Sequence, residues 1–356
     1  MVHVLVKNLM VQSEKTTHQD IKHEKQSTGL RSQKLASSPQ AHPFGPFVPK
    51  VTADGSYTFF SPDFQEAFHS HQGAKLEAEL KFVKTTQIEQ LAQRPTVNIL
   101  DVCYGLGYNT AAALTTIWQI NPGCHVHWFG LELDINVPKA AIAHHLLDPW
   151  PTPITQLLTA LATTSAPIQG RRQKAEGRRR NSPPPHLPTP PTPQLPFTGQ
   201  LLLGDARQTI QTVQSSGFHA DAIFLDPFSP ISCPQLWTVE FLSWVVRCLA
   251  TNGRLTTYSC SAAARTALRM TGLILGSTPG VGRKSPGTVA SFTAGQFPSL
   301  SQKEEEHLKT RSSIPYRDPT LTDTKEIIIQ RRRQEQSESN LETTSQWKKR
   351  WTKQDQ

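Results

Sequence analysis

The chain has 356 residues, of which 37% are hydrophobic, and a formal net charge of +9. This length allows one large domain or two ordinary ones, and the low hydrophobic content predicts that part of the chain stays outside a packed core. Five cysteines without paired spacing argue against a disulfide framework, and no apolar run approaches the roughly 20 residues of a membrane span. We therefore expect a soluble, cytoplasmic protein without membrane contact.

The positive charge is concentrated in three segments. Residues 1–40 carry 6 Lys and Arg against 3 acids, residues 160–199 carry 6 against 1, and residues 331–356 carry 7 against 4. We predict a disordered leader, then an Arg- and Pro-rich disordered insertion with 8 prolines in residues 183–196, and finally a basic C-terminal tail. The rest of the predicted domain at 41–330 is nearly neutral. The basic segments could attract a polyanion such as RNA, or their charges could simply be solvated.

The domain opens with a predicted β-hairpin in residues 46–70, which turns at Ala53–Ser56, and with a helix in residues 73–92. A helix or turn that opens after Ser61 and Pro62 carries His69 and His71. Two histidines without companions at ligand spacing make a poor metal site, so we expect no metal there and interpret them as a polar pocket lining.

Residues 97–109 are the most informative stretch of the chain. Val97–Val102 predicts a buried parallel strand, and Gly105 and Gly107 allow a tight turn that approaches a ligand closely. A helix is predicted from Asn109 onward. The stretch therefore resembles a nucleotide-binding loop at a helix N-terminus.

Two ligands compete for this loop. The dinucleotide pattern G-x-G-x-x-G requires glycine at position 110, which is Thr110, so an NAD-dependent oxidoreductase is disfavoured. The alternative pattern, acid-x-G-x-G-x-G, is that of S-adenosylmethionine (SAM) methyltransferases, and it aligns Asp101, Gly105 and Gly107. Cys103 stands at its first glycine, which we expect to be tolerated if φ at this residue is negative.

Strands and helices alternate through the rest of the domain. Strands are predicted at 125–131, at the start of 199–210, at 223–225 and at 254–259, helices at 138–147, 236–250 and 262–272, and a closing hairpin at 273–292. We predict an α/β fold with a doubly wound, mainly parallel sheet, Rossmann-like as in class I SAM methyltransferases, preceded by the hairpin and helix extension.

Acidic residues end four of these strands. Asp101, Glu132, Asp205 and Asp226 should meet at the carboxyl edge of the sheet, where such folds bind ligands. With SAM in this pocket, Glu132 would hold the ribose, Asp205 would meet the adenine amino group, and Asp226 would face the methyl group.

An alkylamine is the acceptor that this arrangement suits. Such an amine has a pKa of about 10.4 and is protonated at neutral pH, so a carboxylate such as Asp226 must accept an N–H and orient the nitrogen. Phe228, Trp237 and Tyr258 could stack a nucleic-acid base, or they could belong to the core.

The chain resembles the MnmC-like methyltransferases, the methyltransferase domain of the enzyme that forms 5-methylaminomethyl-2-thiouridine in tRNA. The resemblance covers about 41–150 and 200–330. It rests on T-A-D-G-S (52–56), F-x-E-x-x-H-S (64–70), G-A-x-x-E (73–77), L-D-V-C-Y-G-L-G-Y-N (100–109), D-P-F-S-P-x-x-x-P-x-L-W (226–237), T-Y-S (257–259), G-R-K (282–284) and I-P-Y-R-D-P (314–319).

This resemblance implies SAM-dependent methylation of the aminomethyl group on wobble uridine 34 of tRNA. It assigns Gly105, Gly107, Asn109 and Glu132 to the cofactor site and Asp226 to the amine. We add Asp101 and Asp205 to the cofactor residues, and we assign Asp54, Glu66, His69, Phe228, Trp237 and Tyr258 to the substrate site.

No second nucleotide loop follows residue 260, so we expect a stand-alone methyltransferase without the flavin oxidoreductase half. A separate flavin-dependent or aminomethyl-forming enzyme would then act upstream. A non-catalytic RNA-binding protein that retains the fold remains the other alternative.

Overall fold

The computed structural model describes residues 47–164, 166–169, 195–281, 285–295 and 297–354. The chain divides into two units, Met1–Gln40 and Ala41–Gln356, and all that follows concerns the second. The predicted leader, most of the predicted insertion (170–194) and the G-R-K motif at 282–284 lie outside the described residues.

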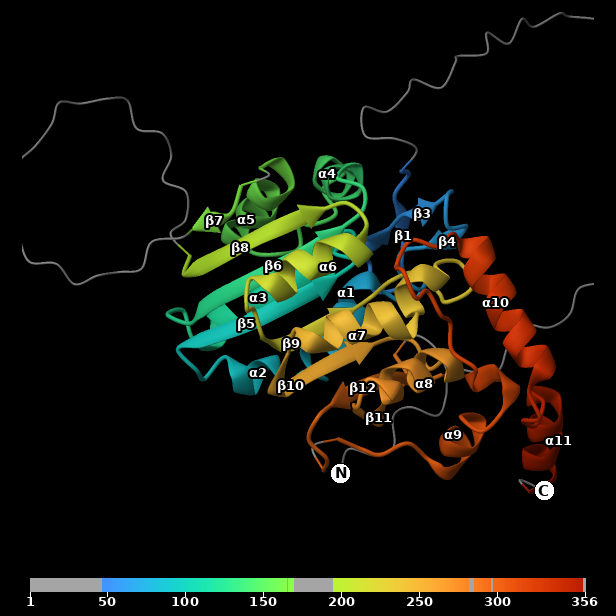
Figure 1. Ribbon diagram of the computed structural model, residues 1–356. Coiled ribbons are helices and arrows are strands. Elements are labelled where there is room, and N and C mark those ends of the chain that lie inside the picture. Colours follow the sequence, from blue (N-terminus) through green and yellow to red (C-terminus); the bar gives the residue numbers. More distant parts are fainter. Residues whose placement is uncertain (1–46, 165, 170–194, 282–284, 296, 355–356) are drawn as a thin grey trace, which may run out of the picture. The chain divides into compact units, whose positions relative to one another are not determined.

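An eight-stranded sheet forms the centre of this unit (Figure 1), with the strand order β11-β12-β10-β9-β5-β6-β8-β7. Its strands are β5 (Thr96–Val102), β6 (His125–Glu132), β7 (Ile168–Gln169), β8 (Phe197–Leu203), β9 (Ala220–Leu225), β10 (Leu249–Thr257), β11 (Ile274–Thr278) and β12 (Gly287–Ser291). The five central strands run parallel, whereas β7, β11 and β12 pair antiparallel at the two edges. The predicted mainly parallel α/β fold is confirmed.

Helices cover both faces of the sheet. They are α3 (Tyr108–Ile120), α4 (Asn136–Ala143), α5 (Thr152–Thr163), α6 (Ala206–Ser215), α7 (Val239–Arg247) and α8 (Ala262–Met270). Alternate residues of β5 enter different cores: Val97 and Ile99 pack with α3, whereas Leu100 and Val102 pack on the side of α6 and α7. Because successive side chains of a strand point to opposite faces, an apolar run such as Val97–Val102 can serve both cores at once.

The N-terminal extension consists of two small hairpins and a helical segment. Its elements are β1 (Lys50–Val51), β2 (Tyr57–Thr58), β3 (Phe60–Ser61), β4 (Glu66–Ala67), α1 (Ala74–Glu77), the π-helix η1 (Ala78–Val83) and α2 (Ile88–Leu91). The pairing of β1 with β2 confirms the hairpin predicted around Ala53–Ser56. The predicted helix at 73–92 is divided by the six-residue π-helix.

Three predicted boundaries are wrong. The predicted insertion starts too early, because α5 continues to Thr163 and buries Ile154, Leu158 and Leu161 at helical spacing. The predicted helix at 236–250 is a 3-10 turn, η2 (Pro234–Trp237), followed by α7. Asn252–Gly253 lies inside β10, where the pairing with β9 shifts register between Leu249 and Arg254, rather than in a turn before it.

The segment from residue 301 onward is helical and packed, which corrects the predicted domain end at 330 and the basic tail. It contains α9 (Gln302–His307), η3 (Arg311–Ser313), α10 (Lys325–Glu338) and α11 (Thr344–Gln354). Ile328 is fully buried, Arg331 pairs with Asp323 at 2.7 Å, and Arg350 pairs with Glu342 at 3.0 Å.

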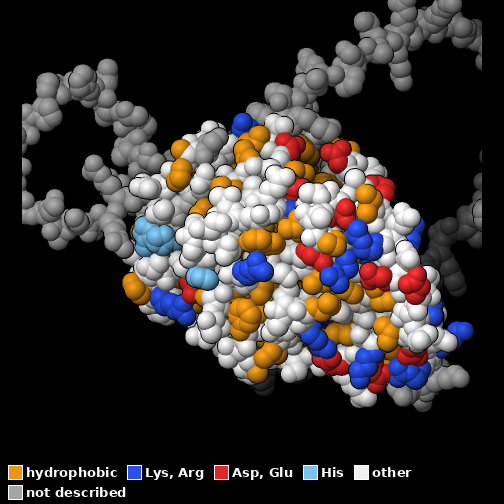
Figure 2. Space-filling view, in the orientation of Figure 1, with side chains coloured by type: hydrophobic (Ala, Val, Ile, Leu, Met, Phe, Trp, Pro, Cys, Tyr) orange, Lys and Arg blue, Asp and Glu red, His pale blue; other side chains and the backbone are white. Residues whose placement is uncertain are grey.

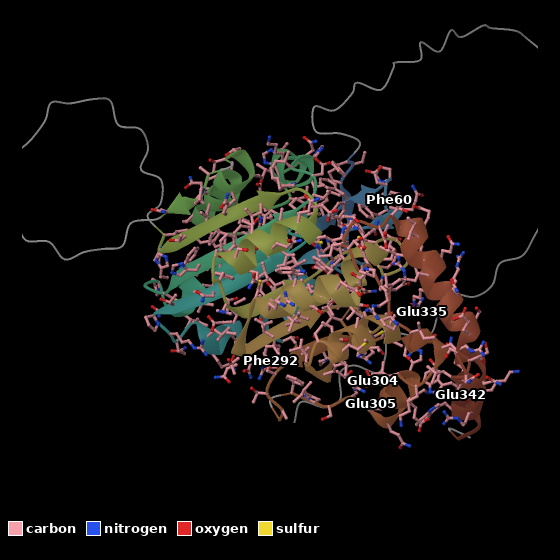
Figure 3. The ribbon with its side chains drawn as sticks, in the orientation of Figure 1. Phe60, Phe292, Glu304, Glu305, Glu335 and Glu342 are labelled. Carbon is pink, nitrogen blue, oxygen red and sulfur yellow. The ribbon has the colours of Figure 1, made fainter. Side chains whose placement is uncertain are left out.

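Ion pairs also join this segment to the rest of the unit. Glu304 and Glu305, labelled in Figure 3, pair with Arg265 and Arg269 of α8 at 2.8 and 2.7 Å. In Figure 2, Lys and Arg side chains are interspersed with Asp and Glu over the C-terminal helices. Arginines of the tail therefore form ion pairs with acidic residues of the same unit. The described helices include none that is long and apolar enough to cross a membrane.

Candidate active site

The loop between β5 and α3 has the backbone geometry of a ligand cradle. Cys103, Gly105 and Gly107 all have positive φ, at 68°, 57° and 86°. The expectation that φ at Cys103 is negative is therefore wrong: the cysteine adopts a left-handed conformation that usually favours glycine. A Cβ on Gly107 would lie 2.5 Å from the Tyr104 hydroxyl oxygen, so this position has no room for a larger side chain.

Glu132 supports this loop from the neighbouring strand. Its carboxylate accepts hydrogen bonds from the backbone N–H groups of Gly105, at 2.8 Å, and Asp134, at 2.9 Å. Burial raises the pKa of Glu132 to about 7, although the backbone hydrogen bonds favour the charged form. The carboxylate lines the pocket, where it can also accept bonds from the hydroxyl groups of a ribose.

Asp101 lies beneath the loop rather than in the pocket. It is fully buried, and its Oδ2 accepts a hydrogen bond from the Thr110 hydroxyl at 2.6 Å, which in turn accepts one from the Trp128 indole at 3.0 Å. Its Oδ1 has no partner, and burial raises the pKa of Asp101 to about 8. Asp101 therefore supports the base of the loop. The sequence analysis predicted that it contacts the cofactor directly, and this geometry does not match that prediction.

Asp226 reaches the same pocket from the end of β9. Its Oδ2 accepts a hydrogen bond from the Asn109 side-chain amide at 2.9 Å, and its backbone N–H donates to Val102 at 3.1 Å. Asn109 lies in the first turn of α3, so the helix that follows the glycine loop also orients this carboxylate. Asp226 and the glycine loop therefore meet at one edge of the sheet.

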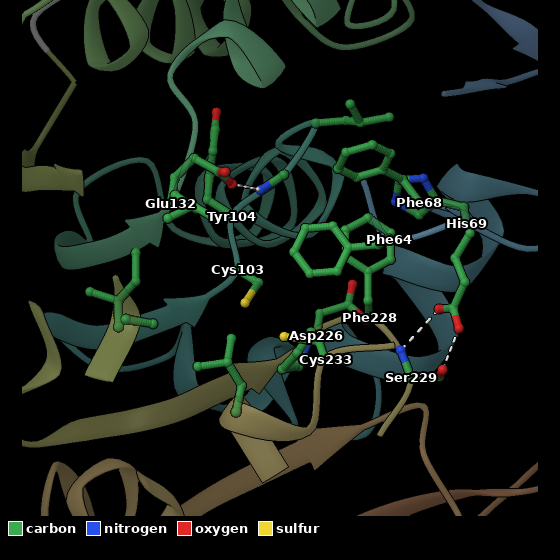
Figure 4. A pocket seen from close by; sticks show the side chains of 18 of the residues that line it. Phe64, Phe68, His69, Cys103, Tyr104, Glu132, Asp226, Phe228, Ser229 and Cys233 are labelled. Carbon is green, nitrogen blue, oxygen red and sulfur yellow. Dashed lines mark hydrogen bonds between the residues drawn. The ribbon is translucent and has the colours of Figure 1, made fainter. Parts of the chain in front are cut away.

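The pocket has a volume of about 590 Å³, within the range of small-molecule sites. Figure 4 shows Glu132 and Tyr104 at one end of it, and Asp226, Phe228 and Phe64 toward the other. The sequence-predicted residues that line it are Gly105, Asn109, Glu132, Asp205, Asp226, Glu66, His69, Phe228 and Tyr258. Asp101, Gly107, Asp54 and Trp237 do not line it.

The N-terminal extension closes the second end of the pocket. The Glu66 carboxylate accepts hydrogen bonds from the backbone N–H of Ser229, at 2.9 Å, and from the hydroxyl groups of Ser229 and of Ser232, the latter at 2.8 Å. The Phe64 ring stacks on Phe228 with ring centroids 4.5 Å apart. Glu66 thus joins the extension to the loop after β9 and also lines the pocket, so its predicted contact with the substrate stays a prediction.

Three other predicted substrate residues divide between the pocket and its support. His69 lines the pocket, and burial lowers its pKa to about 4, so the ring is neutral at pH 7. Asp54 instead holds the first hairpin turn, with Oδ1 accepting from Ser56 and Oδ2 accepting from the N–H of Leu76 at 2.9 Å. Trp237 is fully buried and donates to the Phe228 carbonyl at 2.8 Å, so it cannot stack a base.

Several pocket residues were not assigned to the site in the sequence analysis. Glu77 lines the pocket and forms a buried ion pair with Lys81 at 3.1 Å, four residues later on the same helical segment. Phe64 and Phe68 contribute rings from the extension, and Arg207 reaches the pocket beside Asp205. The spacing of Glu77 and Lys81 in G-A-x-x-E-x-x-x-K could have predicted this ion pair, because residues four apart on a helix are neighbours.

Among the described residues, no group of three or more His, Cys, Asp or Glu side chains could hold a metal ion. The residues present do fit SAM. Gly105, at positive φ, lines the pocket and leaves the backbone open to a ligand, and the Glu132 carboxylate, which can accept from a ribose, accepts a hydrogen bond from its N–H. A cofactor held there would leave the end of the pocket near Asp226 and Phe228 for an acceptor.

Known proteins are similar to this chain in sequence and in fold. The model of a family of S-adenosyl-L-methionine-dependent methyltransferases matches residues 194–293. An uncharacterised protein of Methanocaldococcus jannaschii is 30% identical over 288 residues, which are 79% of this chain and 70% of that protein. The crystal structure of MnmC2 from Aquifex aeolicus has 31% identity and a TM-score of 0.65, with 83% of this chain and 86% of that chain covered. The chain belongs to the MnmC-like methyltransferase family.

This MnmC-like methyltransferase is a SAM-dependent enzyme, which sets aside the dehydrogenase and the non-catalytic alternatives. It is also 26% identical over 253 residues to the tRNA 5-methylaminomethyl-2-thiouridine biosynthesis bifunctional protein MnmC of Acidovorax sp.. The matched region is 69% of this chain but only 35% of that relative, so the MnmC-like methyltransferase corresponds to about a third of the bifunctional protein.

Proposed function

We propose that this methyltransferase transfers a methyl group from SAM to the primary amine of a 5-aminomethyl group on wobble uridine 34 of tRNA. The name of the bifunctional relatives, which refers to 5-methylaminomethyl-2-thiouridine in tRNA, supports the choice of acceptor. The observation that carries the proposal is the Asp226 carboxylate, which Asn109 orients at 2.9 Å in the wall of the pocket that also holds the glycine loop.

An alkylamine must be deprotonated before its lone pair can attack a methyl group. Its ordinary pKa of about 10.4 leaves little neutral amine at pH 7. A carboxylate at the acceptor end attracts the ammonium form, accepts one N–H and orients the nitrogen once a proton has left. Asp226 is the residue that we assign to this role, and positioning by the pocket then supplies much of the acceleration.

The loop after Asp226 offers further contacts for the acceptor. The Tyr258 hydroxyl donates to the Pro227 carbonyl at 2.9 Å, which fixes the direction of that carbonyl beside the carboxylate. A carbonyl oxygen has two lone pairs, so it can accept a second N–H from the amine. We assign the base to the Phe228 ring, whereas Tyr258 acts through Pro227.

The cofactor end is assigned to the glycine loop and two carboxylates. SAM supplies an electrophilic methyl group on a sulfonium. Gly105 allows the backbone to approach it, Glu132 accepts from the ribose hydroxyls, and Asp205 accepts from the adenine amino group. Asp101, Thr110 and Gly107 hold the loop in shape from below.

The free amine on uridine 34 has to be formed before this methyltransferase acts. We assign that step to a flavin-dependent or aminomethyl-forming activity. The basic segments at 1–40 and 160–199, which carry net charges of +3 and +5, would add long-range attraction to the tRNA phosphates.

Mass spectrometry of tRNA nucleosides tests this proposal. The enzyme is incubated with SAM that carries an isotopically labelled methyl group and with three tRNAs, whose position 34 holds uridine, carboxymethylaminomethyluridine or aminomethyluridine. We expect label only in the third tRNA, as methylaminomethyluridine. Label on a different nucleoside, or equal labelling of the three tRNAs, would overturn the proposed acceptor.

A further inference from the structure

A partly buried network links the adenine end of the pocket to the C-terminal part of the chain. Arg207 follows Asp205 by two residues, and its guanidinium contacts both Asp205 and Asp318, a residue 111 positions later. We propose that Arg207 and Asp318 are positioning residues that set the adenine selectivity of Asp205. The inference rests on the proposed role of Asp205 at the adenine amino group.

Arg207 fixes the Asp205 carboxylate in one orientation. The Arg207 Nε donates to Oδ1 and Oδ2 at 3.1 and 3.0 Å, and its Nη2 donates to Oδ2 at 2.6 Å. The backbone N–H of Arg207 donates to Oδ1 at 2.9 Å, because Asp205 is the N-cap of α6. Three hydrogens thus make four contacts on this carboxylate, two on each oxygen. Because the Nε hydrogen is shared between Oδ1 and Oδ2, and the Asp205 side chain is 32% exposed, the carboxylate can still accept about one more donor, which is what an adenine amino group supplies.

Asp318 balances the charge of the arginine. Its side chain is fully buried, and its Oδ2 accepts from the Arg207 Nη1 at 2.9 Å. Arg207 is thereby shared between two carboxylates. Arg207, Asp205 and Asp318 together carry a net charge of −1, whereas Arg207 and Asp205 alone would be neutral. Since adenine presents N–H donors at this end, the remaining negative charge favours an amino group over a carbonyl.

The position of Asp318 is itself well determined. Its Oδ1 accepts from the backbone N–H groups of Thr322 and Asp323, both at 3.1 Å, and its own N–H donates to Glu240 of α7 at 2.8 Å. Arg317 also pairs with Glu240, at 2.7 Å. The proposed reaction gives no role to the motif at 314–319. These contacts attach the motif to α7, and Asp318 connects it to the cofactor site through Arg207.

Calorimetric binding of two nucleosides to the full chain tests the inference. S-adenosylhomocysteine carries the 6-amino group, whereas S-inosylhomocysteine carries a carbonyl at the same position. We expect the wild type to prefer the adenosyl compound by about thirtyfold and Asp318→Asn to reduce this preference to about threefold, because the variant removes the balancing charge. Arg207→Lys keeps the charge but loses the planar guanidinium that holds Asp205 through two nitrogens, so it should also reduce the preference. This variant replaces Asp318→Asn as the test if Asp318→Asn does not fold.

Glu240→Gln is the matched control, because Glu240 anchors the same segment without contacting Arg207. It should leave the preference at the wild-type value, even if both affinities change together. An undiminished preference in Asp318→Asn and in Arg207→Lys would overturn the inference. If the wild type itself shows no preference, the adenine role of Asp205 is wrong and the inference falls with it, whereas the labelling of tRNA remains an independent test of the acceptor.

Discussion

The two ends of the pocket are built in different ways. The cofactor end consists of residues at or just after the ends of parallel strands, such as Glu132 and Asp205, and it is shaped by hydrogen bonds to nearby backbone groups. The acceptor end joins segments that are far apart in the chain: Glu66 and Ser229 are 163 residues apart. Sheet topology alone thus creates the first end, whereas the second exists only when the N-terminal extension docks on the loop after β9.

This difference separates the expected effects of mutations. Changes at the strand ends should alter cofactor binding or chemistry without affecting how the extension docks. Changes in the clamp made by Glu66, Ser229 and Ser232 should alter acceptor binding and leave the cofactor site intact. Asp226 lies where the two ends meet, so it offers the strongest test.

Asp226→Ala should give the largest effect. If this carboxylate orients the amine as proposed, its removal should lower kcat for tRNA methylation by about 10²–10⁴-fold, while the Kd for S-adenosylhomocysteine stays within about threefold. Steady-state kinetics and calorimetry measure the two quantities, and Asp148→Ala, a change at an exposed acid, is the control. Unchanged turnover in Asp226→Ala would remove this residue from the mechanism.

The cofactor end should show a pH dependence that originates in Glu132. Burial raises the pKa of this group to about 7 in the free protein, and ribose hydroxyls donate to the charged form. The affinity for S-adenosylhomocysteine should therefore be highest above pH 7 and fall by about tenfold per pH unit below it, because a proton must leave before the ligand binds.

Glu132→Gln should bind S-adenosylhomocysteine about 10–100-fold more weakly at pH 8 and with little dependence on pH, as titration calorimetry from pH 5.5 to 8.5 would measure. Asp134→Asn keeps the backbone N–H that Glu132 accepts, so the affinity should still fall as the pH falls, but at a lower pH than in the wild type, because the charge of Asp134 helps to raise the pKa of Glu132. A wild-type affinity that rises as the pH falls would contradict this account of Glu132.

At the acceptor end, Glu66→Ala should raise the KM for tRNA by about tenfold, since it removes charge-assisted hydrogen bonds to Ser229 and Ser232. The Kd for S-adenosylhomocysteine should change by less than about twofold. Asp63→Ala, a change at an exposed acid in the same hairpin, is the control. If Glu66→Ala weakens both ligands equally, the two ends are not separate.

The smallest expected effect concerns stability. Cys103→Gly should increase the free energy of unfolding by about 1 kcal/mol, because glycine adopts the positive φ of 68° without the strain of a Cβ. Cys103→Ala keeps the Cβ and should give no such gain. Denaturant unfolding without ligand measures both, and a destabilised Cys103→Gly protein would show that packing of the thiol outweighs the backbone strain.

Much of the cofactor end could be predicted from sequence, because strand ends and glycine turns have local signatures. Glu132 is the last residue of β6 and Asp226 directly follows β9, and both line the pocket. Asp101 shows the limit of this argument. It lies one residue before the end of β5, and its side chain meets Thr110 under α3. A shift of one position along a strand moves a side chain to the opposite face.

The acceptor end and the C-terminal helices were less predictable because they depend on long-range contacts. The motif around Glu66 indicated a role but not its partners Ser229 and Ser232. The composition of residues 331–356 suggested a solvated tail. Arg331 and Arg350 instead form ion pairs with Asp323 and Glu306, which lie outside that segment. Local charge counts do not reveal such partners.

A crystal structure with S-adenosylhomocysteine and 5-aminomethyluridine would test most directly that cofactor and amine meet at Asp226. We expect the ribose hydroxyls of S-adenosylhomocysteine on Glu132 and the amine nitrogen about 2.6–3.2 Å from an Asp226 oxygen, on the side that faces the cofactor sulfur. An amine bound elsewhere, with Asp226 contacting only Asn109, would contradict the account.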